Sequence, residues 1–402
     1  MTYNEAVQWL YSAVPNFQRD GGSKNYKIGL EGPQALWEYL GFPGRDIPTI
    51  HVAGTNGKGS TVHMLASGMK EMGLKVGVFC SPHLFNFRER AKIGTTMVPE
   101  MFVAEFVSAH KTHFEQYGYS FFELTLMLSL QWFQSEEVDW IILETGMGGR
   151  LDATNICAPE LCIITNIGLD HVQWLGNTRA LIAKEKAGII KPGVPVVVVQ
   201  NDNETRPVFK DSANEAGAPL IWAKDFNLPT DLKGIHQHAN RNGAATALEL
   251  LFPEYQELWK LGLNRVVKNT ALAGRWMEID TSPLTICDTG HNADAFQYLV
   301  PQAKAAANGA HIHWVLGSAG DKDFGSILQL LPIDNSTFYW TGASSPRCAS
   351  SAVLAESAAN HGRYGNHFTH VQQALSAART NANEQDLIFI GGSTFVVADL
   401  EL

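Results

Sequence analysis

The stretch IHVAGTNGKGST at residues 50–61 combines glycines, one lysine and two adjacent hydroxyl side chains in a spacing that suits phosphate binding. Glycines let successive backbone N–H groups converge on a phosphate, and the helix that follows presents the positive end of its dipole. Lys58 can reach the outer phosphate oxygens of a nucleotide. We therefore predict a nucleoside triphosphate site made by Gly54, Thr55, Asn56, Gly57, Lys58, Gly59, Ser60 and Thr61.

This loop departs from the common pattern G-x-x-x-x-G-K-[ST] at two positions. Val52 stands where that pattern has glycine, and Gly59 directly follows the lysine, so the hydroxyls come one residue later. The dinucleotide fingerprint G-x-G-x-x-G is absent, and the lysine favours a triphosphate. The alternative is an ordinary glycine-rich turn, which the coincidence of strand, lysine, hydroxyls and helix disfavours.

Polar side chains follow three other segments that read as strands. Ser81 follows KVGVFC, Glu144 ends VDWIILE, and Asp170 and His171 follow LCIITNI. Because parallel strands end at one edge of a sheet, we expect these side chains to lie near the phosphate loop. Glu144 suits Mg²⁺, which prefers oxygen ligands. From its residue type alone, His171 stays open between a structural role and a supporting role near a metal.

The elements that must position these residues alternate along the chain from about residue 49. Short β-branched apolar runs alternate with longer helical patterns, which is typical of βαβ units around a parallel sheet. The first series of strands is expected near residues 50, 77, 141, 164 and 197, and the second near 285, 314, 338 and 388. Helices are expected to begin near Pro99 and at the capping box Ser120–Glu123, and one to end near Gly73.

Two series of strands predict two domains of the α/β class. We expect a larger P-loop-containing parallel-sheet domain at residues 1–269 and a smaller Rossmann-like α/β domain at residues 276–402. A linker is expected at residues 270–275, with a hinge that lets the smaller domain close over the larger one.

Composition excludes several other classes of protein. The chain has 30 Lys and Arg against 40 Asp and Glu, so a nucleic-acid binder with broad basic surfaces is disfavoured. Five Cys without a C-x-x-C pair indicate neither a disulfide framework nor a zinc site. The first residues read as an amphipathic helix, and no apolar run approaches the ~20 residues that span a bilayer. We therefore expect a cytoplasmic protein with small-molecule substrates and neither nucleic-acid nor membrane partners.

Taken together, these motifs resemble the folylpolyglutamate synthase and dihydrofolate synthase family, a branch of the Mur-type ATP-dependent ligases. The resemblance runs along nearly the whole chain. In order, the matching segments are IHVAGTNGKGST, SPHL, ILETGMGGRLDATN, ITNIGLDH, AKEKAGIIKPG, HQHAN, AGRW, DTGHN and GSAGDKDF. The resemblance implies that the larger domain is of the Mur-ligase central-domain type and that the protein is a monomer.

The resemblance also implies which residues hold two Mg²⁺ ions beside ATP. Ser81 and Glu144 would hold one ion, and His171 would help hold a second. Lys186 matches a lysine that is carbamylated in this family, so it would present a carboxylate-like group to a metal. Together with Lys58, the resemblance places His171 and Lys186 in the catalytic centre.

Other positions are implied to contact the substrates. Asn240 and Arg275 match nucleotide-contacting positions, although Asn242 competes with Asn240 for that role. Asp288 and His291 match the catalytic positions that the smaller domain contributes to the cleft, and Asp288 is also expected to contact the nucleotide. His291 is the candidate for the base that deprotonates the incoming amine. The expected folate-side residues are Ser81, Pro82, His83 and Asp152.

The implied reaction joins L-glutamate to a folate-type carboxylate through an acyl phosphate formed from ATP. The substrate would be 7,8-dihydropteroate, a reduced folate or both; Asp152 favours both, and a monofunctional folylpolyglutamate synthase is the alternative. A cell-wall Mur ligase is disfavoured because about 48 residues precede the loop, too few for a nucleotide-sugar domain. A P-loop kinase or ATPase would leave DTGHN unexplained, and a non-catalytic binding protein would leave the matched metal positions unexplained.

Overall fold

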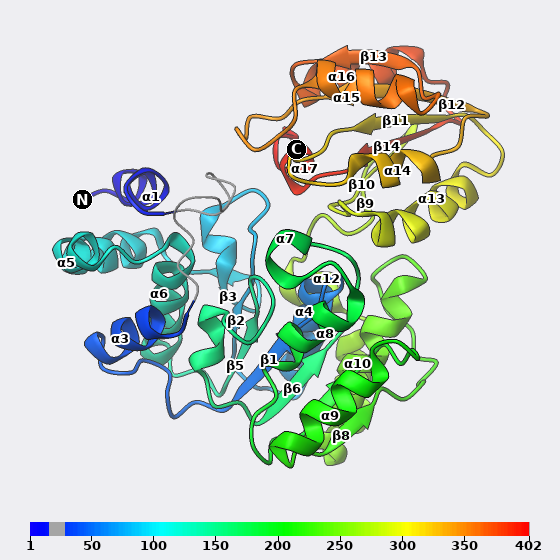
Figure 1. Cartoon of the computed structure of the whole chain (residues 1–402). Coiled ribbons are helices and arrows are strands. Elements are labelled where there is room, and N and C mark those ends of the chain that lie inside the picture. The colour runs from blue at the N-terminus through cyan, green and yellow to red at the C-terminus, as the bar shows by residue number, and fades with distance from the viewer. Residues whose placement is uncertain (16–28, 402) are drawn as a thin grey trace. The chain divides into compact units, whose positions relative to one another are not determined.

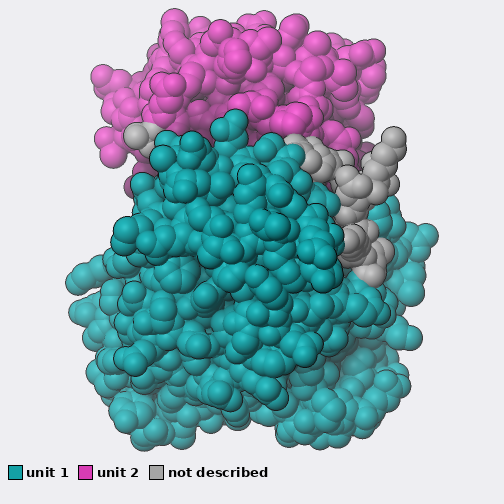
Figure 2. All heavy atoms as spheres, turned by 90° about the vertical axis from the view of Figure 1, so that its left-hand side faces the viewer, with its two compact units in different colours: residues 1–232, 236–272 teal, residues 233–235, 273–402 magenta. Residues whose placement is uncertain are grey.

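The computed structural model describes residues 1–15 and 29–401. The chain divides into two compact units, which Figure 2 colours separately. Unit 1 comprises residues 1–232 and 236–272, and unit 2 comprises residues 233–235 and 273–402.

Unit 1 is built on an eight-stranded sheet with the order β4-β3-β2-β5-β1-β6-β7-β8 (Figure 1). Strands β2, β5, β1, β6, β7 and β8 run parallel, whereas β3 and β4 are antiparallel additions at one edge. In chain order the strands are β1 Thr49–Ala53, β2 Val76–Phe79, β3 Ala91–Ile93, β4 Thr96–Met97, β5 Trp140–Glu144, β6 Leu161–Ile164, β7 Val196–Val198 and β8 Leu220–Trp222.

Helices cover both faces of this sheet, as its near-continuous apolar strands require. The helices are α1 Tyr3–Ser12, α3 Glu31–Tyr39, α4 Lys58–Glu71, α5 Glu100–Tyr117, α6 Phe121–Ser135, α7 Val172–Leu175, α8 Arg179–Ala187, α9 Arg206–Ala216, α10 His236–Leu251, α11 Gln256–Leu263 and α12 Val266–Thr270. Three 3₁₀ turns lie between them, η1 Phe87–Arg90, η2 Ala153–Ile156 and η3 Pro253–Tyr255.

The central strand β1 shows how the two faces are divided. Successive side chains of a strand point to opposite faces. Ile50 and Val52 pack in one apolar cluster with residues of α4, α10 and α11. Ala53 packs in another with residues of α8 and α9. All five residues of β1 are buried, so the strand fixes the start of the loop that follows it.

Unit 2 is a six-stranded sheet with the order β13-β12-β11-β14-β10-β9, covered by helices (Figure 1). All neighbouring strands are parallel except β9, which pairs antiparallel with β10. Its strands are β9 Met277–Thr281, β10 Leu284–Cys287, β11 Ile312–Leu316, β12 Ser336–Thr341, β13 Gly365–Phe368 and β14 Leu387–Gly391. Its helices are α13 Ala293–Ala307, α14 Phe324–Leu330, α15 Ser351–Asn360, α16 Val371–Asn381 and α17 Thr394–Ala398.

The predicted α/β class is confirmed, and so are the helix starts. Helix α5 has Pro99 at its N-cap, and Ser120 caps α6 in a complete capping box with Glu123. The sheets are mixed, however, where the sequence predicted parallel strands. The antiparallel hairpin β3–β4 and the edge strands β8, β9 and β13 were missed because they are short or only partly buried. Such strands lack the continuous apolar run that reveals a central strand.

Two further expectations concern the thiols and the helices. The five cysteines, all in the described part of the chain, are free thiols. Among the described residues, no helix is long and apolar enough to cross a membrane.

Helix α4, which begins at the phosphate loop, is held against α11 by a close backbone approach. A Cβ added to Gly262 of α11 would lie 2.4 Å from the Ser67 carbonyl oxygen and 2.5 Å from the Gly68 Cα. The Ser67 hydroxyl donates to the Gly262 carbonyl at 2.6 Å. Only glycine at position 262 lets the two helices touch in this way, so this contact sets the position of α4.

We expect Gly262→Ala to destabilise unit 1 by about 1–3 kcal/mol, because the methyl group has to push α11 away from α4. Gly325→Ala in α14 is the matched control, since its Cβ would meet atoms no closer than 3.5 Å. Denaturant unfolding of both variants measures the difference. Equal stability of the two variants would show that the α4–α11 contact is not tight.

Candidate active site

The phosphate loop joins the end of β1 to the start of α4 and is shaped by two glycines with positive φ. Gly54 has a φ of 153°, and a Cβ there would lie 1.8 Å from the Thr165 hydroxyl. Gly57, the N-cap of α4, has a φ of 83°, and its Cβ would lie 2.2 Å from Asn240 Oδ1. Both positions therefore require glycine for backbone conformation and for space.

The loop backbone is pinned by the residues that follow β6. Asn166 accepts from the Thr55 N–H through its carbonyl at 2.8 Å and from the Asn56 N–H through its side chain at 2.7 Å. The Thr165 hydroxyl donates to the Asn56 carbonyl at 2.6 Å. These contacts hold the loop open before any nucleotide binds, which lowers the cost of ordering it.

Two lysine side chains converge on one carbonyl of the loop. Lys58 Nζ donates to the Gly54 carbonyl at 3.0 Å, and Lys186 Nζ, from α8, donates to the same oxygen at 2.8 Å. Lys186 is 4% exposed. Two ammonium groups so close to each other repel, and burial weakens their hydration.

The environment of Lys186 changes its protonation. Burial, followed by the charge of Lys58, lowers the pKa of Lys186 to about 7, although Asp170 and Asp152 oppose the shift. A sizeable part of the Lys186 amine is therefore neutral and nucleophilic near neutral pH.

Glu144 ends β5 at the sheet edge from which the phosphate loop emerges, since β5 pairs in parallel with β1. Its side chain is buried, and Oε2 accepts from the Ser81 N–H at 3.3 Å. The structure thus brings Ser81 and Glu144 together. Thr61 Oγ1 is also buried, without a hydrogen-bond partner in the described chain.

No group of three or more His, Cys, Asp and Glu side chains is arranged to hold a metal ion within residues 1–15 and 29–401. The ligands that the resemblance implies include a serine and a modified lysine, which such a group does not contain. The assignment of Ser81, Glu144, His171 and Lys186 as metal ligands stays a prediction.

The glycine-rich segment after β5 is folded back by Asp152. The Asp152 carboxylate accepts from the Met147 N–H at 2.8 Å and from the Thr154 hydroxyl at 2.5 Å. Burial raises the pKa of Asp152, and these hydrogen bonds oppose the shift. Gly149 lies against the Lys186 carbonyl, where a Cβ would come within 2.8 Å. This segment therefore links Glu144 at its start to Lys186.

His171 lies at the start of α7 with a φ of 51°, a left-handed conformation that is uncommon for a residue with a Cβ. Its backbone N–H donates to Asp170 Oδ1 at 2.8 Å, and its Nε2 is 3.9 Å from Asp170 Oδ2. The strained backbone is a reason to consider a functional role.

The segment after β2 turns its histidine toward the helices of unit 1. Arg90 Nε donates to His83 Nδ1 at 2.8 Å, and His83 Nε2 is 3.0 Å from the Tyr11 hydroxyl. Because Nδ1 accepts, Nε2 carries the proton and donates to Tyr11. Burial and the charge of Arg90 hold the pKa of His83 well below its usual value. The neutral His83 ring thus lies between Arg90 and Tyr11 of α1, whereas its neighbour Pro82 is exposed.

The structure separates the two asparagines proposed for the nucleotide. Asn240 is packed against Gly57 of the phosphate loop. Asn242 instead donates to Asp225 at 3.2 Å and accepts from Arg241 at 3.0 Å. Of the two, Asn240 has the position that suits a nucleotide contact.

In unit 2, the segment that contains Arg275 is hydrogen-bonded to the segment that contains Asp288. Asp288 is buried, and its carboxylate accepts from the Trp276 N–H at 2.8 Å and the Gly290 N–H at 2.7 Å. Arg275 donates to the Thr289 hydroxyl. His291 Nδ1 donates to the Thr289 carbonyl at 3.1 Å. Residues 274–276 are therefore anchored to the DTGHN segment.

Sequence reasoning missed several residues that shape the site. Thr165 and Asn166 lie directly after β6, at the edge where site residues were expected, but the prediction there named only Asp170 and His171. Thr154 and Asn155 lie in the matched segment GGRLDATN but were assigned no role, although Asn155 donates to the Arg150 and Gly188 carbonyls at 3.0 Å each. For Thr165 and Asn166, the available signal was their position directly after the end of a strand.

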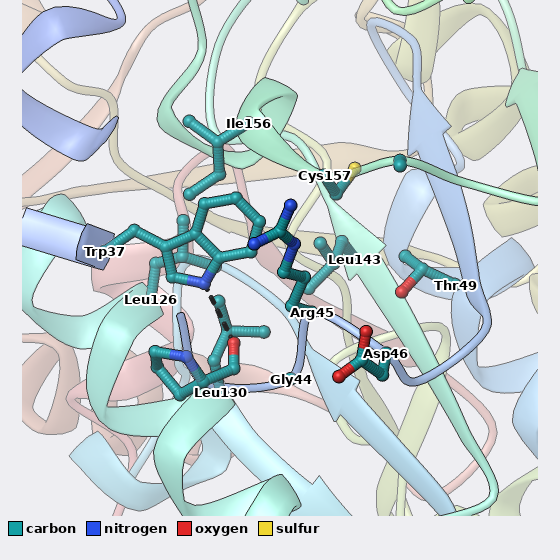
Figure 3. A pocket seen from close by; sticks show the side chains of 12 residues that line it. Trp37, Gly44, Arg45, Asp46, Thr49, Leu126, Leu130, Leu143, Ile156 and Cys157 are labelled. Atoms are coloured by element: carbon teal, nitrogen blue, oxygen red, sulfur yellow. Dashed lines mark hydrogen bonds between the residues drawn. The ribbon is translucent and has the colours of Figure 1, made fainter. Parts of the chain in front are cut away.

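A separate cavity of about 310 Å³ lies in unit 1, near the residue at which β1 begins (Figure 3). Trp37 and Arg45 line one part, and Ile156 and Cys157, at the end of η2, line another. Leucines of β5 and α6 complete the apolar wall. None of the predicted site residues lines this cavity.

We expect Gly57→Ala to raise the KM for ATP by about tenfold or more, because the methyl group displaces Asn240 or the loop from its position. Gly73→Ala is the matched control: its φ of 87° imposes similar backbone strain, but no atom lies within 4 Å of the added Cβ. Initial-rate kinetics with varied ATP measures the effect. An equal rise of KM in both variants would contradict the role assigned to the Gly57–Asn240 contact.

Comparison with known proteins places this geometry in a family. Residues 52–251 match the Mur ligase middle domain, and residues 274–394 match the Mur ligase glutamate ligase domain. The dihydrofolate synthase/folylpolyglutamate synthase of Escherichia coli is 32% identical, over 94% of this chain and 91% of that protein. The protein of the same name from Bacillus subtilis is 28% identical, over 99% of this chain and 98% of that protein.

Solved structures agree with these relatives. E. coli FolC in complex with DHPP and ADP superposes with a TM-score of 0.84 at 30% identity, covering 98% of this chain and 96% of that one. A bifunctional folylpolyglutamate synthase/dihydrofolate synthase with Mn, AMPPNP and L-glutamate bound gives a TM-score of 0.86 at 29% identity, covering 99% and 97%. The chain therefore belongs to the dihydrofolate synthase and folylpolyglutamate synthase family of Mur ligases.

Proposed function

We propose that this protein uses ATP to join L-glutamate to a pteroate or folate carboxylate, and that it acts on both 7,8-dihydropteroate and reduced folates. The observation that carries the proposal is the preformed phosphate loop with Lys58 and Lys186 on one carbonyl, in a chain of this family. Relatives are named for both activities, and one has been solved with nucleotide and L-glutamate.

The chemistry follows from the poor reactivity of a carboxylate. An ionised carboxylate has no good leaving group, so the γ-phosphate of ATP is first transferred to one of its oxygens, giving an acyl phosphate and ADP. The glutamate amine, having lost a proton, attacks the acyl carbon. The tetrahedral intermediate then expels phosphate and leaves an amide. Positioning and charge neutralisation supply the rate enhancement in such transfers.

The loop residues of this chain would hold the nucleotide. Residues 54–61 present backbone N–H groups and the start of α4 to the phosphates. Lys58, now bound to the carbonyls of Gly54 and Thr55, would turn its ammonium toward the β- and γ-phosphate oxygens. Asn240 and, from unit 2, Arg275 are the proposed contacts to the rest of the nucleotide.

The residues at the edge of the sheet fit a divalent metal. A buried carboxylate of Glu144 beside Ser81 offers the oxygen ligands that Mg²⁺ prefers. Ser81 and Glu144 would hold one ion, and His171 with a carbamylated Lys186 would hold a second. When bound, the ions would offset negative charge on the phosphates.

Carbamylation of Lys186 is favoured by its surroundings. The neutral amine attacks the carbon of CO₂, a C–N bond forms, and one proton is released to solvent. The lowered pKa of Lys186 makes the neutral amine available near pH 7. The product carries a negative charge beside Lys58, so repulsion between two cations becomes attraction.

Other assignments complete the proposal. We assign the binding of the folate-type substrate to Ser81, Pro82, His83 and Asp152. We assign the catalytic residues of unit 2 to Asp288 and His291. We assign the linker to residues 270–275, between domains at 1–269 and 276–402. We further propose a cytoplasmic monomer that uses small-molecule substrates alone.

The test of the reaction uses purified protein with Mg-ATP and radiolabelled L-glutamate. One reaction contains 7,8-dihydropteroate and another contains tetrahydrofolate, and products are separated by mass. We expect label to enter both substrates. Label in tetrahydrofolate alone would assign a monofunctional folylpolyglutamate synthase, and ATP hydrolysis without label in either would refute the ligase assignment.

For Lys186, we expect Lys186→Met to lower kcat at least about 10- to 100-fold, because the carboxylate-like group and its ion are lost. A ¹³C-bicarbonate NMR experiment should show a carbamate signal in the wild type and none in this variant. The control is Lys184→Met, which removes an exposed lysine from the same helix. A carbamate signal that persists in Lys186→Met would assign the modification to another lysine.

A further inference from the structure

His51 is a buried titratable residue that the proposed reaction does not use. It lies in the middle of β1 with no exposed surface. Its Nε2 is 2.8 Å from the Thr154 hydroxyl. Its Nδ1 is buried and has no hydrogen-bond partner in the described part of the chain. An unpaired ring nitrogen in the core costs free energy of folding. A histidine at this position therefore needs an explanation, and its one hydrogen bond, to Thr154, is the place to look for it.

The direction of that bond follows from the partners of Thr154. A hydroxyl has one proton, and the Thr154 proton is directed to Asp152 Oδ1 at 2.5 Å. His51 must therefore donate its Nε2 proton to Thr154. Burial, assisted by the charge of Lys191, lowers the pKa of His51 to about 3, so the ring stays neutral with its proton on Nε2.

This chain of hydrogen bonds ends at the glycine-rich segment beside the site. Asp152 Oδ1 also accepts from the Thr154 N–H at 3.1 Å, and Oδ2 accepts from the Met147 N–H at 2.8 Å. The carboxylate thereby joins η2 to the segment that runs between Glu144 and Lys186. His51 lies at the far end of this chain of hydrogen bonds from His51 through Thr154 to Asp152, which we call the relay.

The packing of η2 is incomplete at its end. The cavity near the start of β1 is lined by Ile156 and Cys157, so the end of η2 faces open space there (Figure 3). The hydrogen bond from His51 to the buried Thr154 hydroxyl therefore adds a directed polar contact to the packing of η2, whose Ala153 belongs to the apolar cluster that includes residues of α6. This explains why a histidine occupies a strand position otherwise suited to an aliphatic side chain.

We propose that His51 is a positioning residue, which orients the Asp152 carboxylate and the glycine-rich segment through the Thr154 hydroxyl and so sets the affinity for the folate-type substrate. This inference rests on the proposed function, since Asp152 is assigned to the folate side. His51 does not touch the reacting atoms, so its effect belongs to substrate binding.

The test compares four variants with a matched control. His51→Leu removes the donor, His51→Gln offers an amide N–H in its place, Thr154→Val removes the hydroxyl, and His51→Leu with Thr154→Val removes both groups. Thr49→Val is the control, because Thr49 is a buried residue of β1 two positions before His51, and its hydroxyl donates to a carbonyl two residues away, that of Ile47. KM and kcat are measured separately for dihydropteroate and for ATP.

We expect His51→Leu to raise the KM for dihydropteroate about tenfold, as the loss of one buried hydrogen bond predicts, with little change in the KM for ATP. His51→Gln should restore part of the affinity, and Thr49→Val should behave as wild type. The double variant should be no worse than the more damaging single variant, because both changes break one relay.

Additive effects in the double variant, or an equal rise of both KM values, would overturn the proposal. If His51→Leu does not fold, the same test compares Thr154→Val, which removes the hydroxyl, with Thr154→Ser, which keeps it. The ¹⁵N spectrum of His51 gives a readout independent of activity: the expected tautomer has its proton on Nε2, and a proton on Nδ1 refutes the relay. A wild-type protein that ligates no glutamate would refute the proposed function, whereas this spectrum still decides the relay.

Discussion

The Gly54 carbonyl is the point on which the site depends, because two lysine side chains from separate helices converge on it. Lys58 comes from α4 and Lys186 from α8, and each donates to this one oxygen. The geometry is possible only because position 54 has no side chain, since a Cβ would overlap the Thr165 hydroxyl. The resulting repulsion is relieved when one of the two lysines is neutral.

The strands and helices of unit 1 hold the phosphate loop and the residues around it in position. Strand β1 is the central parallel strand, with β5 on one side and β6 on the other, so Glu144 and Asn166 both reach the loop's edge of the sheet. Helix α4 is set by its backbone contact with α11 at Gly262. Beyond the loop, Asp152 and Asn155 fold the glycine-rich segment against α8. A site for transferring a phosphoryl group needs such rigidity, because preorganised groups lose little energy on rearrangement.

Several polar groups around the site are buried and hydrogen-bonded, in contrast to the exposed ion pairs elsewhere. The relay from His51 through Thr154 to Asp152 runs from β1 to η2 in the buried interior, where hydrogen bonds are strong and an unpaired group is costly. The pair Arg150–Glu185 lies largely at the surface and contributes little by comparison. Buried networks of this kind give orientation to side chains that must meet a substrate.

The sequence by itself determined the α/β class, the central strands, the helix starts at Pro99 and Ser120, and the phosphate loop. These features depend on local signals, namely apolar periodicity, capping residues and glycine spacing, which a short window of residues contains. The tertiary structure alone decided that Lys186 meets Lys58, that Asn240 and not Asn242 lies against Gly57, and that His51 supports Asp152. Those contacts join residues far apart in the chain, and burial, which shifts the pKa of Lys186 and His51, exists only once the core has formed.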